Sequence, residues 1–324
     1  MPSADSRRIT SLGDSLIDFL PIQEQEQTTG FHLAPGGSML NVAVGLARLG
    51  APVAYAGKVA NDFFGVRLWE YMRGEGIDER FVARMEGHTT LAFTAMLHGE
   101  PSFTFYGDGT ADTLLAIDEL PEEFFSETAI LHTGSTSLLR GTIPGTIHAA
   151  MERLRGRALI SLDPNIRPSL VRDRHAFHTL FDHLAALTDV LKLSTVDLAW
   201  LYPDEAEASA VRRLLDAGPE VVLVTHGHEG VFLSARSGIR LRCPTFPVKV
   251  VDTVGAGDAF SAGLLASLFE HDITSRAALA QCTEDMLALL LLRATAVAAL
   301  NCTRPGANPP THAEVDAYLR EHAL

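Results

Sequence analysis

The stretch VKVVDTVGAGDAF, residues 248–260, changes from an extended run through a glycine turn into the start of a helix. Small residues at a helix start allow backbone N–H groups and the positive end of the helix dipole to approach an anion closely. Asp258 lies in the first helical turn, where its carboxylate can accept a proton from a hydroxyl group. The same residues also fit a plain alternative, in which Gly255 and Gly257 shape a turn and Asp258 caps the helix.

Around this stretch, short β-rich runs alternate with segments of helical periodicity. The runs at residues 9–12, 53–56 and 130–133 are followed by predicted helices at 38–49, 64–73 and 143–154, and further β-rich runs lie at 158–162, 190–193 and 221–225. The last run is continuously apolar, as is typical of strands that are buried on both faces. The pattern predicts an α/β fold with a mostly parallel central sheet and helices on both of its faces.

One region departs from this alternation. Residues 91–97 and 102–106 alternate in polarity and flank the turn-like link 98–101, so they predict an antiparallel pair with no helix between its strands. Residues 28–33 are a candidate third strand. We interpret these strands as a small lid, inserted near 28–33 and 91–106 into a single domain that spans residues 1–324. A sheet this small is seldom stable alone, so we expect the lid to cover a ligand, a second subunit or both.

The composition disfavours several classes of partner. The chain has 324 residues, with 26 Lys and Arg against 40 Asp and Glu and a net charge of −14. Such a charge repels nucleic acid and anionic membranes, and we expect neither as a partner. Cys243, Cys282 and Cys302 are far apart and form no C-x-x-C pair, so we expect neither a disulfide framework nor a zinc site. These thiols, and an N-terminal segment unlike a signal peptide, predict a cytoplasmic protein.

Three further segments place polar residues beside predicted strand ends or helix starts: residues 13–18, 35–41 and 163–167. Ligands of parallel sheets gather beyond the strand ends, where Asp18 could hold hydroxyl groups. Paired glycines let a ligand approach the backbone, and Asn41 offers both a donor and an acceptor. Arg167 could grip a phosphate with two hydrogen bonds. Each segment taken alone is also compatible with an ordinary turn or glycine-rich loop.

Together these segments resemble the ribokinase-like (PfkB) family of carbohydrate kinases, and the resemblance runs from Gly13 to about Ala307. The family's N-terminal G-G-x-x-x-N signature matches Gly36, Gly37 and Asn41, and its C-terminal D-T-x-G-A-G-D signature matches residues 252–258 in order. Two separate motifs in the correct order outweigh the plain interpretation of either one. The resemblance implies the three-layer ribokinase-like fold, a lid over the substrate, and ATP with Mg²⁺ as cofactors.

The resemblance also implies a role for each matching residue. Asp258 would be the catalytic base, and the backbone amides of Gly255, Ala256 and Gly257 would form the anion hole. The sugar site would include Asp14, Asp18, Gly36, Gly37, Asn41, Phe105, Asn165 and Arg167. The ATP site would include Lys192, Ser194, Thr225, Gly227, Gly230 and Asn301. Asp197 would contact Mg²⁺ through water, and Asp252 would lie at a site for a monovalent cation such as K⁺.

Within the family, residues 105–112 and 163–167 look most like fructokinases, which makes D-fructose the leading substrate. Leu16 supports this prediction, because ribokinases commonly carry Asn at the matching position. Two residues depart from the pattern: Asp197 stands where the N-x-x-E magnesium motif has Glu, and Gly107 replaces the Arg common in fructokinase lids. In related kinases the lid often packs against a second subunit, so the resemblance also predicts a homodimer whose interface includes Phe103 or Phe105.

Other functions stay open on the sequence alone. Within the same class, the chain could phosphorylate 2-keto-3-deoxygluconate or a nucleoside. A Rossmann oxidoreductase would need G-x-G-x-x-G after the first strand, where Gly13 stands alone. A non-catalytic sugar sensor would not need a base at Asp258. We therefore predict an ATP-dependent kinase that transfers the γ-phosphate of ATP to a hydroxyl of a ketohexose.

Overall fold

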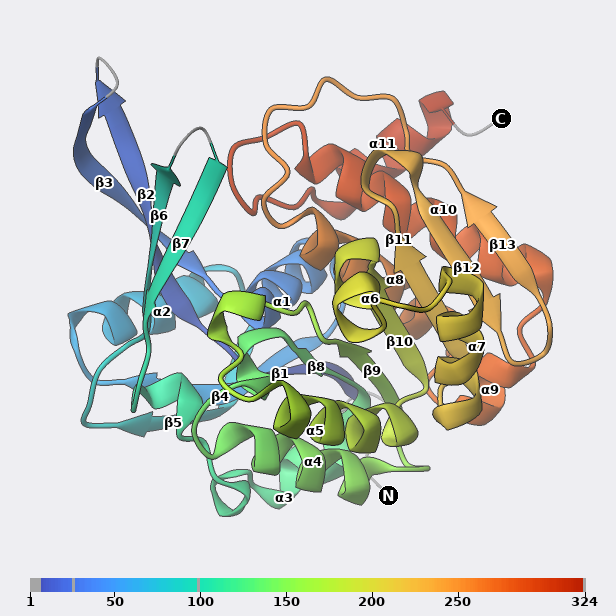
Figure 1. Ribbon diagram of the computed structural model, residues 1–324, viewed down its shortest axis with the longest axis horizontal. Coiled ribbons are helices and arrows are strands. Elements are labelled where there is room, and N and C mark those ends of the chain that lie inside the picture. Colours follow the sequence, from blue (N-terminus) through green and yellow to red (C-terminus); the bar gives the residue numbers. More distant parts are fainter. Residues whose placement is uncertain (1–6, 25–26, 98–99, 323–324) are drawn as a thin grey trace.

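The larger of two sheets in the computed structural model has nine strands in the order β13-β12-β11-β10-β9-β8-β1-β4-β5 (Figure 1). The structure describes residues 7–24, 27–97 and 100–322. The strands of this sheet are β1 (Arg8–Leu12), β4 (Val53–Ala60), β5 (Asp78–Met85), β8 (Thr128–Gly134), β9 (Leu159–Asp163), β10 (Val190–Ser194), β11 (Val221–Thr225), β12 (Val231–Ala235) and β13 (Arg240–Cys243). The strands from β11 to β5 pair in parallel, and β12 and β13 add an antiparallel edge.

Helices cover both faces of this sheet. One layer shares a core with the first face and contains α1 (Ser38–Arg48), α2 (Phe63–Gly74), α8 (Ala256–Glu270), α9 (Arg276–Ala280), α10 (Glu284–Asn301) and α11 (His312–His322). The other layer packs on the second face and contains α3 (Glu122–Glu127), α4 (Ile143–Leu154), α5 (Arg174–Leu187), α6 (Thr195–Leu201) and α7 (Glu207–Ala217). This arrangement confirms the predicted three-layer α/β fold.

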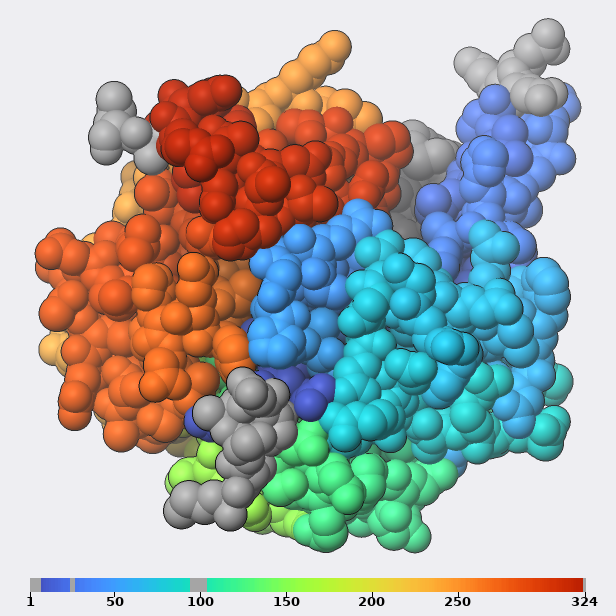
Figure 2. Space-filling view, turned by 180° about the vertical axis from the view of Figure 1, so that it is seen from behind, coloured from blue at the N-terminus to red at the C-terminus, as the bar shows by residue number. Residues whose placement is uncertain are grey.

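Segments that are distant in the sequence pack together in the first layer. Figure 2 shows the C-terminal helices, in orange and red, beside α1 and α2, in blue and cyan. α8 contacts both α1 and α10, and all of its residues from Asp258 to Leu268 are buried. A helix enclosed in this way is apolar around most of its circumference, which explains why α8 shows little amphipathic pattern. The packing brings the N-terminus of α8 next to the N-terminus of α1.

The second sheet is the lid, and it stands apart from the larger sheet in Figure 1. It has four strands in the order β3-β2-β6-β7, namely β2 (Leu16–Glu24), β3 (Gln27–Gly36), β6 (Leu91–Leu97) and β7 (Glu100–Tyr106). The strands predicted near 28–33 and 91–106 are therefore present. The strand β2 was not predicted, because it contains Asp18 and Pro21 within a segment that the sequence pattern suggested was a loop.

The strand register separates the two faces of the lid. Asp18 pairs with Ala92, and Ala92 pairs with Phe105, so these three residues share one face. Phe93 lies on the opposite face, where its ring stacks on Phe19 at a centroid distance of 4.3 Å. Phe105 therefore lies on the Asp18 face rather than on the aromatic one. The side chain of Phe103 lies outside the described residues.

Some local predictions differ from the structure. Residues 244–250 form no regular strand, although residues 248–251 were predicted to be extended. The edge strands β5, β12 and β13 were not predicted, because their alternating polar residues resemble exposed loops. No helix in the described part of the chain combines the length and the apolar character needed to span a bilayer.

Candidate active site

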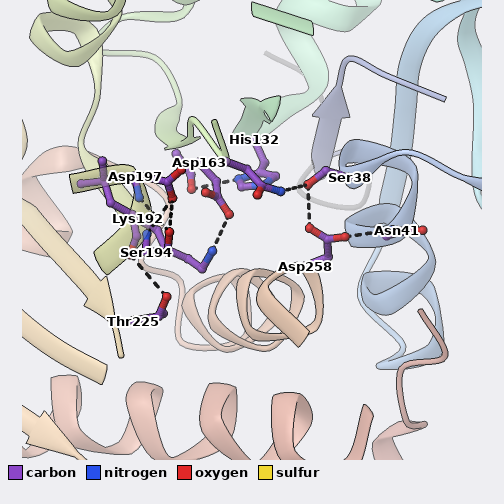
Figure 3. Close-up of polar contacts among 12 residues, drawn as sticks. Ser38, Asn41, His132, Asp163, Lys192, Ser194, Asp197, Thr225 and Asp258 are labelled. Carbon is purple, nitrogen blue, oxygen red and sulfur yellow. Dashed lines mark hydrogen bonds and ion pairs between the residues drawn. The ribbon is translucent and has the colours of Figure 1, made fainter. Parts of the chain in front are cut away.

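The carboxylate of Asp258 lies where α8 meets α1 (Figure 3). The Ser38 hydroxyl donates to Asp258 Oδ1 at 2.6 Å, and Asn41 Nδ2 donates to Asp258 Oδ2 at 2.8 Å. Asp258 is only 7% exposed, yet it belongs to the first turn of α8, where the helix dipole favours negative charge. The structure thus brings the two signature motifs, 217 residues apart at Asn41 and Asp258, into direct contact.

The surroundings of Asp258 set its proton affinity. Burial raises the pKa of Asp258, and the hydrogen bonds from Ser38 and Asn41 partly oppose that effect. The nearby charge of Asp163 also raises this pKa, whereas the charge of Lys192 lowers it. A buried carboxylate with a raised pKa is suited to take a proton from a substrate hydroxyl near neutral pH.

The turn before α8 depends on Gly255. This residue has a φ of 73°, and a Cβ there would lie 2.6 Å from the Cβ of Ala307. Only glycine therefore allows the turn to pack against the segment around Ala307. The N–H of Ala256 donates to the carbonyl of Thr253 at 3.2 Å, so this amide of the predicted anion hole already has an intramolecular partner.

A buried cation lies beside the same turn. The ammonium group of Lys192 is 3.4 Å from the position that a Cβ on Gly257 would occupy. Lys192 forms an ion pair with Asp163, and both side chains are at least nine-tenths buried. Sequence reasoning assigned Lys192 to the nucleotide site but missed Asp163, because the pair joins two different strands, β9 and β10.

The predicted sugar residues surround Asp258 on the side of the lid. Asp14 accepts hydrogen bonds from the Met39 amide at 2.9 Å and the Thr136 hydroxyl at 2.6 Å. Burial, with the charges of Asp14 and Asp258, raises the pKa of Asp18 to about 6. A side chain at position 36 would collide with the Asp18 carboxylate, which explains why Gly36 is a glycine.

The loop after β9 completes this side of the site. Asn165 Nδ2 donates to Ser38 Oγ at 3.2 Å, and Arg167 Nη1 donates to Asn165 Oδ1 at 2.6 Å. The positive charge of Arg167 lowers the pKa of Asp18, so the two groups lie near each other. Gly37 adjoins this network as the residue that precedes α1, and Phe105 faces the same way as Asp18 from the lid.

A cleft of about 410 Å³ opens on the other side of Gly257. Three predicted nucleotide residues, Thr225, Gly227 and Gly230, line this cleft. Its remaining lining is mostly apolar and consists of His228, Val231, Thr245, Phe246, Pro247, Val248, Val250, Thr253, Ala256, Gly257, Phe260, Thr295, Ala298, Ala299 and Cys302. Ala256 and Gly257 belong to the predicted anion hole, whereas the apolar residues from the loop 245–250 and from α10 were not predicted, because they share no motif. The size and the apolar walls suit a small organic ligand such as a nucleobase.

Two predicted nucleotide residues have structural partners instead. Asn301 is fully buried, donates to the carbonyl of Val254 at 2.9 Å and accepts from the amide of Asn308 at 3.0 Å. It therefore joins two loops and does not line the cleft. Ser194 caps α6, where its hydroxyl accepts from the Asp197 amide at 3.1 Å.

The two predicted metal residues are also engaged by the protein. Asp197 accepts hydrogen bonds on both carboxylate oxygens, from the amides of Ile166 at 2.7 Å and Ser194 at 2.8 Å. Asp252 likewise accepts from the amides of Val254 at 3.0 Å and Gly306 at 2.8 Å. Within the described ranges no group of three or more His, Cys, Asp or Glu could hold a metal ion. These residues do not form a metal centre made of protein ligands alone.

The Gly107 departure has a structural counterpart. A Cβ at Gly107 would lie 2.8 Å from Nη1 of Arg140, so the guanidinium of Arg140 occupies the space beside this glycine. The side chain of Arg140 is 15% exposed and comes from the loop before α4. A cation therefore remains at the base of the lid, although it comes from a different segment than the family pattern implies.

A second buried carboxylate, Asp112, ties together the two ends of the β6–β7 hairpin. It accepts a hydrogen bond of 2.6 Å from Thr90, whose hydroxyl lies 2.6 Å from that of Thr110. Burial is the main cause that raises the pKa of Asp112 to about 6. Because the folded pKa is raised, the folded state is favoured at low pH and loses this stability as the pH rises from about 4 through 6.

We therefore expect Asp112→Asn to be more stable than the wild type above pH 7, by roughly 2–3 kcal/mol, because the amide removes the cost of ionising a buried carboxyl whose pKa is raised to about 6. The two proteins should have nearly equal free energies of unfolding at pH 4. Urea denaturation across this pH range measures the difference, with the exposed Asp118→Asn as the matched control. A stability difference that does not change with pH would show that Asp112 does not titrate in this range.

Comparisons with known proteins agree with this geometry. A model of the pfkB family of carbohydrate kinases matches residues 6–314. Fructokinase-1 of Zea mays is 35% identical over 322 residues, which cover 97% of this chain and 98% of that relative. A crystal structure of fructokinase with bound ATP from Xylella fastidiosa has a TM-score of 0.90 and 31% identity, and the match covers 98% of this chain and 99% of that one.

A second solved structure extends the comparison. A double-mutant fructokinase from Vibrio cholerae O395, in a form with fructose, ADP and potassium ion bound, has a TM-score of 0.83 and 26% identity. The match covers 97% of this chain and 98% of that one. The family model covers nearly the whole chain, and the two signature motifs meet at one buried carboxylate. This chain therefore belongs to the pfkB family of carbohydrate kinases.

Proposed function

We propose that this chain is an ATP-dependent fructokinase that phosphorylates D-fructose at its 6-hydroxyl, yielding fructose 6-phosphate and ADP. The observation that carries the proposal is the position of Asp258, between the polar side chains on the lid side and the apolar cleft beside Gly257. The fructokinases from Zea mays and Xylella fastidiosa, which match over nearly the whole chain, support the choice of substrate.

In this mechanism the sugar lies on the lid side and ATP occupies the cleft. Asp18 and Asn41 orient the reacting hydroxyl, and Asp258 takes its proton as the oxygen attacks the γ-phosphorus. The amides of Gly255 and Gly257 and the ammonium of Lys192 stabilise the negative charge on the transferred group. Phosphoryl transfer depends mainly on such positioning and charge stabilisation, because its transition state is loose.

Metal ions would enter largely with the substrate. Mg²⁺ binds phosphate oxygens and keeps several of its waters, so it does not require a full set of protein ligands. Its contribution is to neutralise charge on the ATP phosphates, with Asp197 in reach only through water. K⁺ would bind near Asp252 and the segment 301–307, and the potassium-bound relative from Vibrio cholerae supports this part of the proposal.

A coupled assay of ADP release tests the proposed substrate. We expect a higher kcat/KM for D-fructose than for D-ribose, because Leu16 is 4% exposed and offers no polar contact to a pentose. The panel should include 2-keto-3-deoxygluconate and a nucleoside, and chelation of Mg²⁺ should abolish turnover of every substrate. A preference for ribose or for the keto-acid would move the chain to another branch of the family.

We also propose that the protein is a homodimer formed through the outer, aromatic face of the lid. Phe31 and Tyr106 are 41% and 64% exposed there, and the rings of both lie within 6 Å of Phe93. Exposed aromatic rings on a small sheet are unfavourable in water. A second copy of the chain could bury them by packing against the same face. The unpaired cysteines support the cytoplasm as the compartment of this assembly.

Light scattering should give about twice the chain mass of 35.0 kDa. Because the register separates the two lid faces, Tyr106→Asp should shift the protein toward monomer, whereas Phe105→Asp should mainly raise the KM for the sugar. Both variants add the same charge to adjacent residues, so each is the matched control for the other. A wild-type monomer at micromolar concentration with ordinary activity would show that the lid acts within one chain.

A further inference from the structure

A directed series of hydrogen bonds ends on the carboxylate of Asp258. Arg167 Nη1 donates to Asn165 Oδ1 at 2.6 Å, Asn165 Nδ2 donates to Ser38 Oγ at 3.2 Å, and the Ser38 hydroxyl donates to Asp258 Oδ1 at 2.6 Å. Each group donates toward the next, from a cation to an anion. Hydrogen bonds arranged in this way polarise and strengthen one another in a buried site.

Ser38 is the member that no signature motif assigns. It is the first residue of α1 and is only 7% exposed. Serine near a helix start commonly caps the helix, but here Gly37 holds the N-cap position and Ser38 is the first helical residue. Its hydroxyl is used for Asp258 and Asn165 instead. Both of these partners come from segments that are more than 100 residues away in the sequence.

The partners of Asp258 come from several elements. Asn41 from α1 holds Oδ2, so Ser38 and Asn41 together hold both carboxylate oxygens. Two charged groups also face Asp258 from the sheet: Asp163 raises its pKa and Lys192 lowers it. Asp18 faces Asp258 from the lid, and the charge of Asp258 raises the pKa of Asp18. Among these groups, Ser38 is the neutral donor to Oδ1 of Asp258. Removing its hydroxyl would remove a hydrogen bond that stabilises the ionised carboxylate.

We propose that Ser38 is a positioning residue for the phosphoryl transfer, whose hydroxyl orients Asp258 and keeps its carboxylate ionised. This inference rests on the proposed kinase function of the same site. Without the hydroxyl, the Asp258 carboxylate can rotate away from the substrate oxygen and retains its proton to higher pH. Arg167 holds Asn165, and Asn165 in turn donates a hydrogen bond to Ser38. Through these two bonds Arg167 helps to orient the base.

The test compares pH profiles of kcat for the wild type and Ser38→Ala, with both ATP and fructose saturating. The profile of kcat reports groups in the enzyme–substrate complex, and Asp18 is present in every variant, so only the shift of the acid limb between variants reports on Ser38. We expect the acid limb of Ser38→Ala to move up by about one pH unit, since a hydrogen bond to a charged group is worth at least that much. At pH 7 we expect kcat to fall about tenfold, with the sugar KM within about twofold.

Two further variants make the result specific. Ser11→Ala removes a buried serine hydroxyl that donates to the carbonyl of Met39 at 2.7 Å and does not contact Asp258, so its acid limb should match the wild type. Ser38→Cys keeps a weaker donor at the same place and should give a smaller shift in the same direction. If Ser38→Ala is unfolded by circular dichroism, the cysteine variant provides the same comparison.

The outcomes separate this inference from the function on which it rests. A wild type without sugar-dependent ADP release would overturn the proposed function and, with it, the role of Ser38. An active wild type whose acid limb is unchanged in both Ser38 variants would overturn the role of Ser38 and leave the kinase function standing. An equal shift in Ser11→Ala would also overturn it, because the effect would then follow from general loosening of the start of α1.

Discussion

Replacing Asp258 with asparagine is expected to lower kcat by at least about 10²-fold, because a general base typically contributes 10² to 10⁴ in rate. The amide nitrogen cannot accept the proton of the sugar hydroxyl. The affinity for the sugar should change little, since Asp18 and Asn41 still bind it. Steady-state assays of ADP release, with sugar binding followed by calorimetry, measure both quantities.

The exposed Asp216→Asn on α7 is the matched control and should keep the wild-type kcat. Near-normal turnover in Asp258→Asn would remove this carboxylate from the mechanism. A parallel loss of sugar affinity and kcat would instead show that Asp258 mainly binds the substrate.

Lys192→Met is expected to lower the free energy of unfolding by about 3–5 kcal/mol, because it leaves the buried Asp163 carboxylate without its ion-pair partner. The neighbouring His132 is not expected to compensate, because burial, the larger of the two causes that lower its pKa to about 3 in the wild type, remains in the variant. The variant should also turn over slowly, because the cation beside Gly257 is lost. Urea denaturation and the ADP-release assay measure the two effects.

A second substitution separates the two roles of Lys192. The double variant Lys192→Met/Asp163→Leu has no unpaired buried charge, so it should regain most of the lost stability while kcat stays low. Arg213→Met removes one partner of the exposed pair with Glu205 and should change the stability by less than about 1 kcal/mol. Recovery of kcat in the double variant would show that Lys192 is only structural.

The sequence predicted the features that depend on local patterns. The parallel strands were visible because β-rich runs such as β11 are buried on both faces and therefore continuously apolar. The two motifs were assigned to one site through their resemblance to the pfkB family. In the structure they meet in the Asn41–Asp258 hydrogen bond.

Features that depend on partners far away in the sequence were not predictable in the same way. Ser38 fills an unspecified position of the G-G-x-x-x-N signature, and its hydroxyl meets its partners only when α8 and the loop after β9 approach α1. Asn301 looked available to a ligand, but the folding of two loops against each other buries its amide completely. Arg140, which lies 33 positions later in the sequence, fills the space beside Gly107. No single motif shows that this arginine could replace the one missing at position 107.

Phosphorus NMR of the reaction tests most directly whether this chain transfers phosphate from ATP to fructose. With ATP, Mg²⁺ and D-fructose, the purified protein should form ADP and fructose 6-phosphate in equal amounts, and no ADP should form when the sugar is omitted. Unchanged ATP, or release of inorganic phosphate at the same rate with and without fructose, would contradict the account.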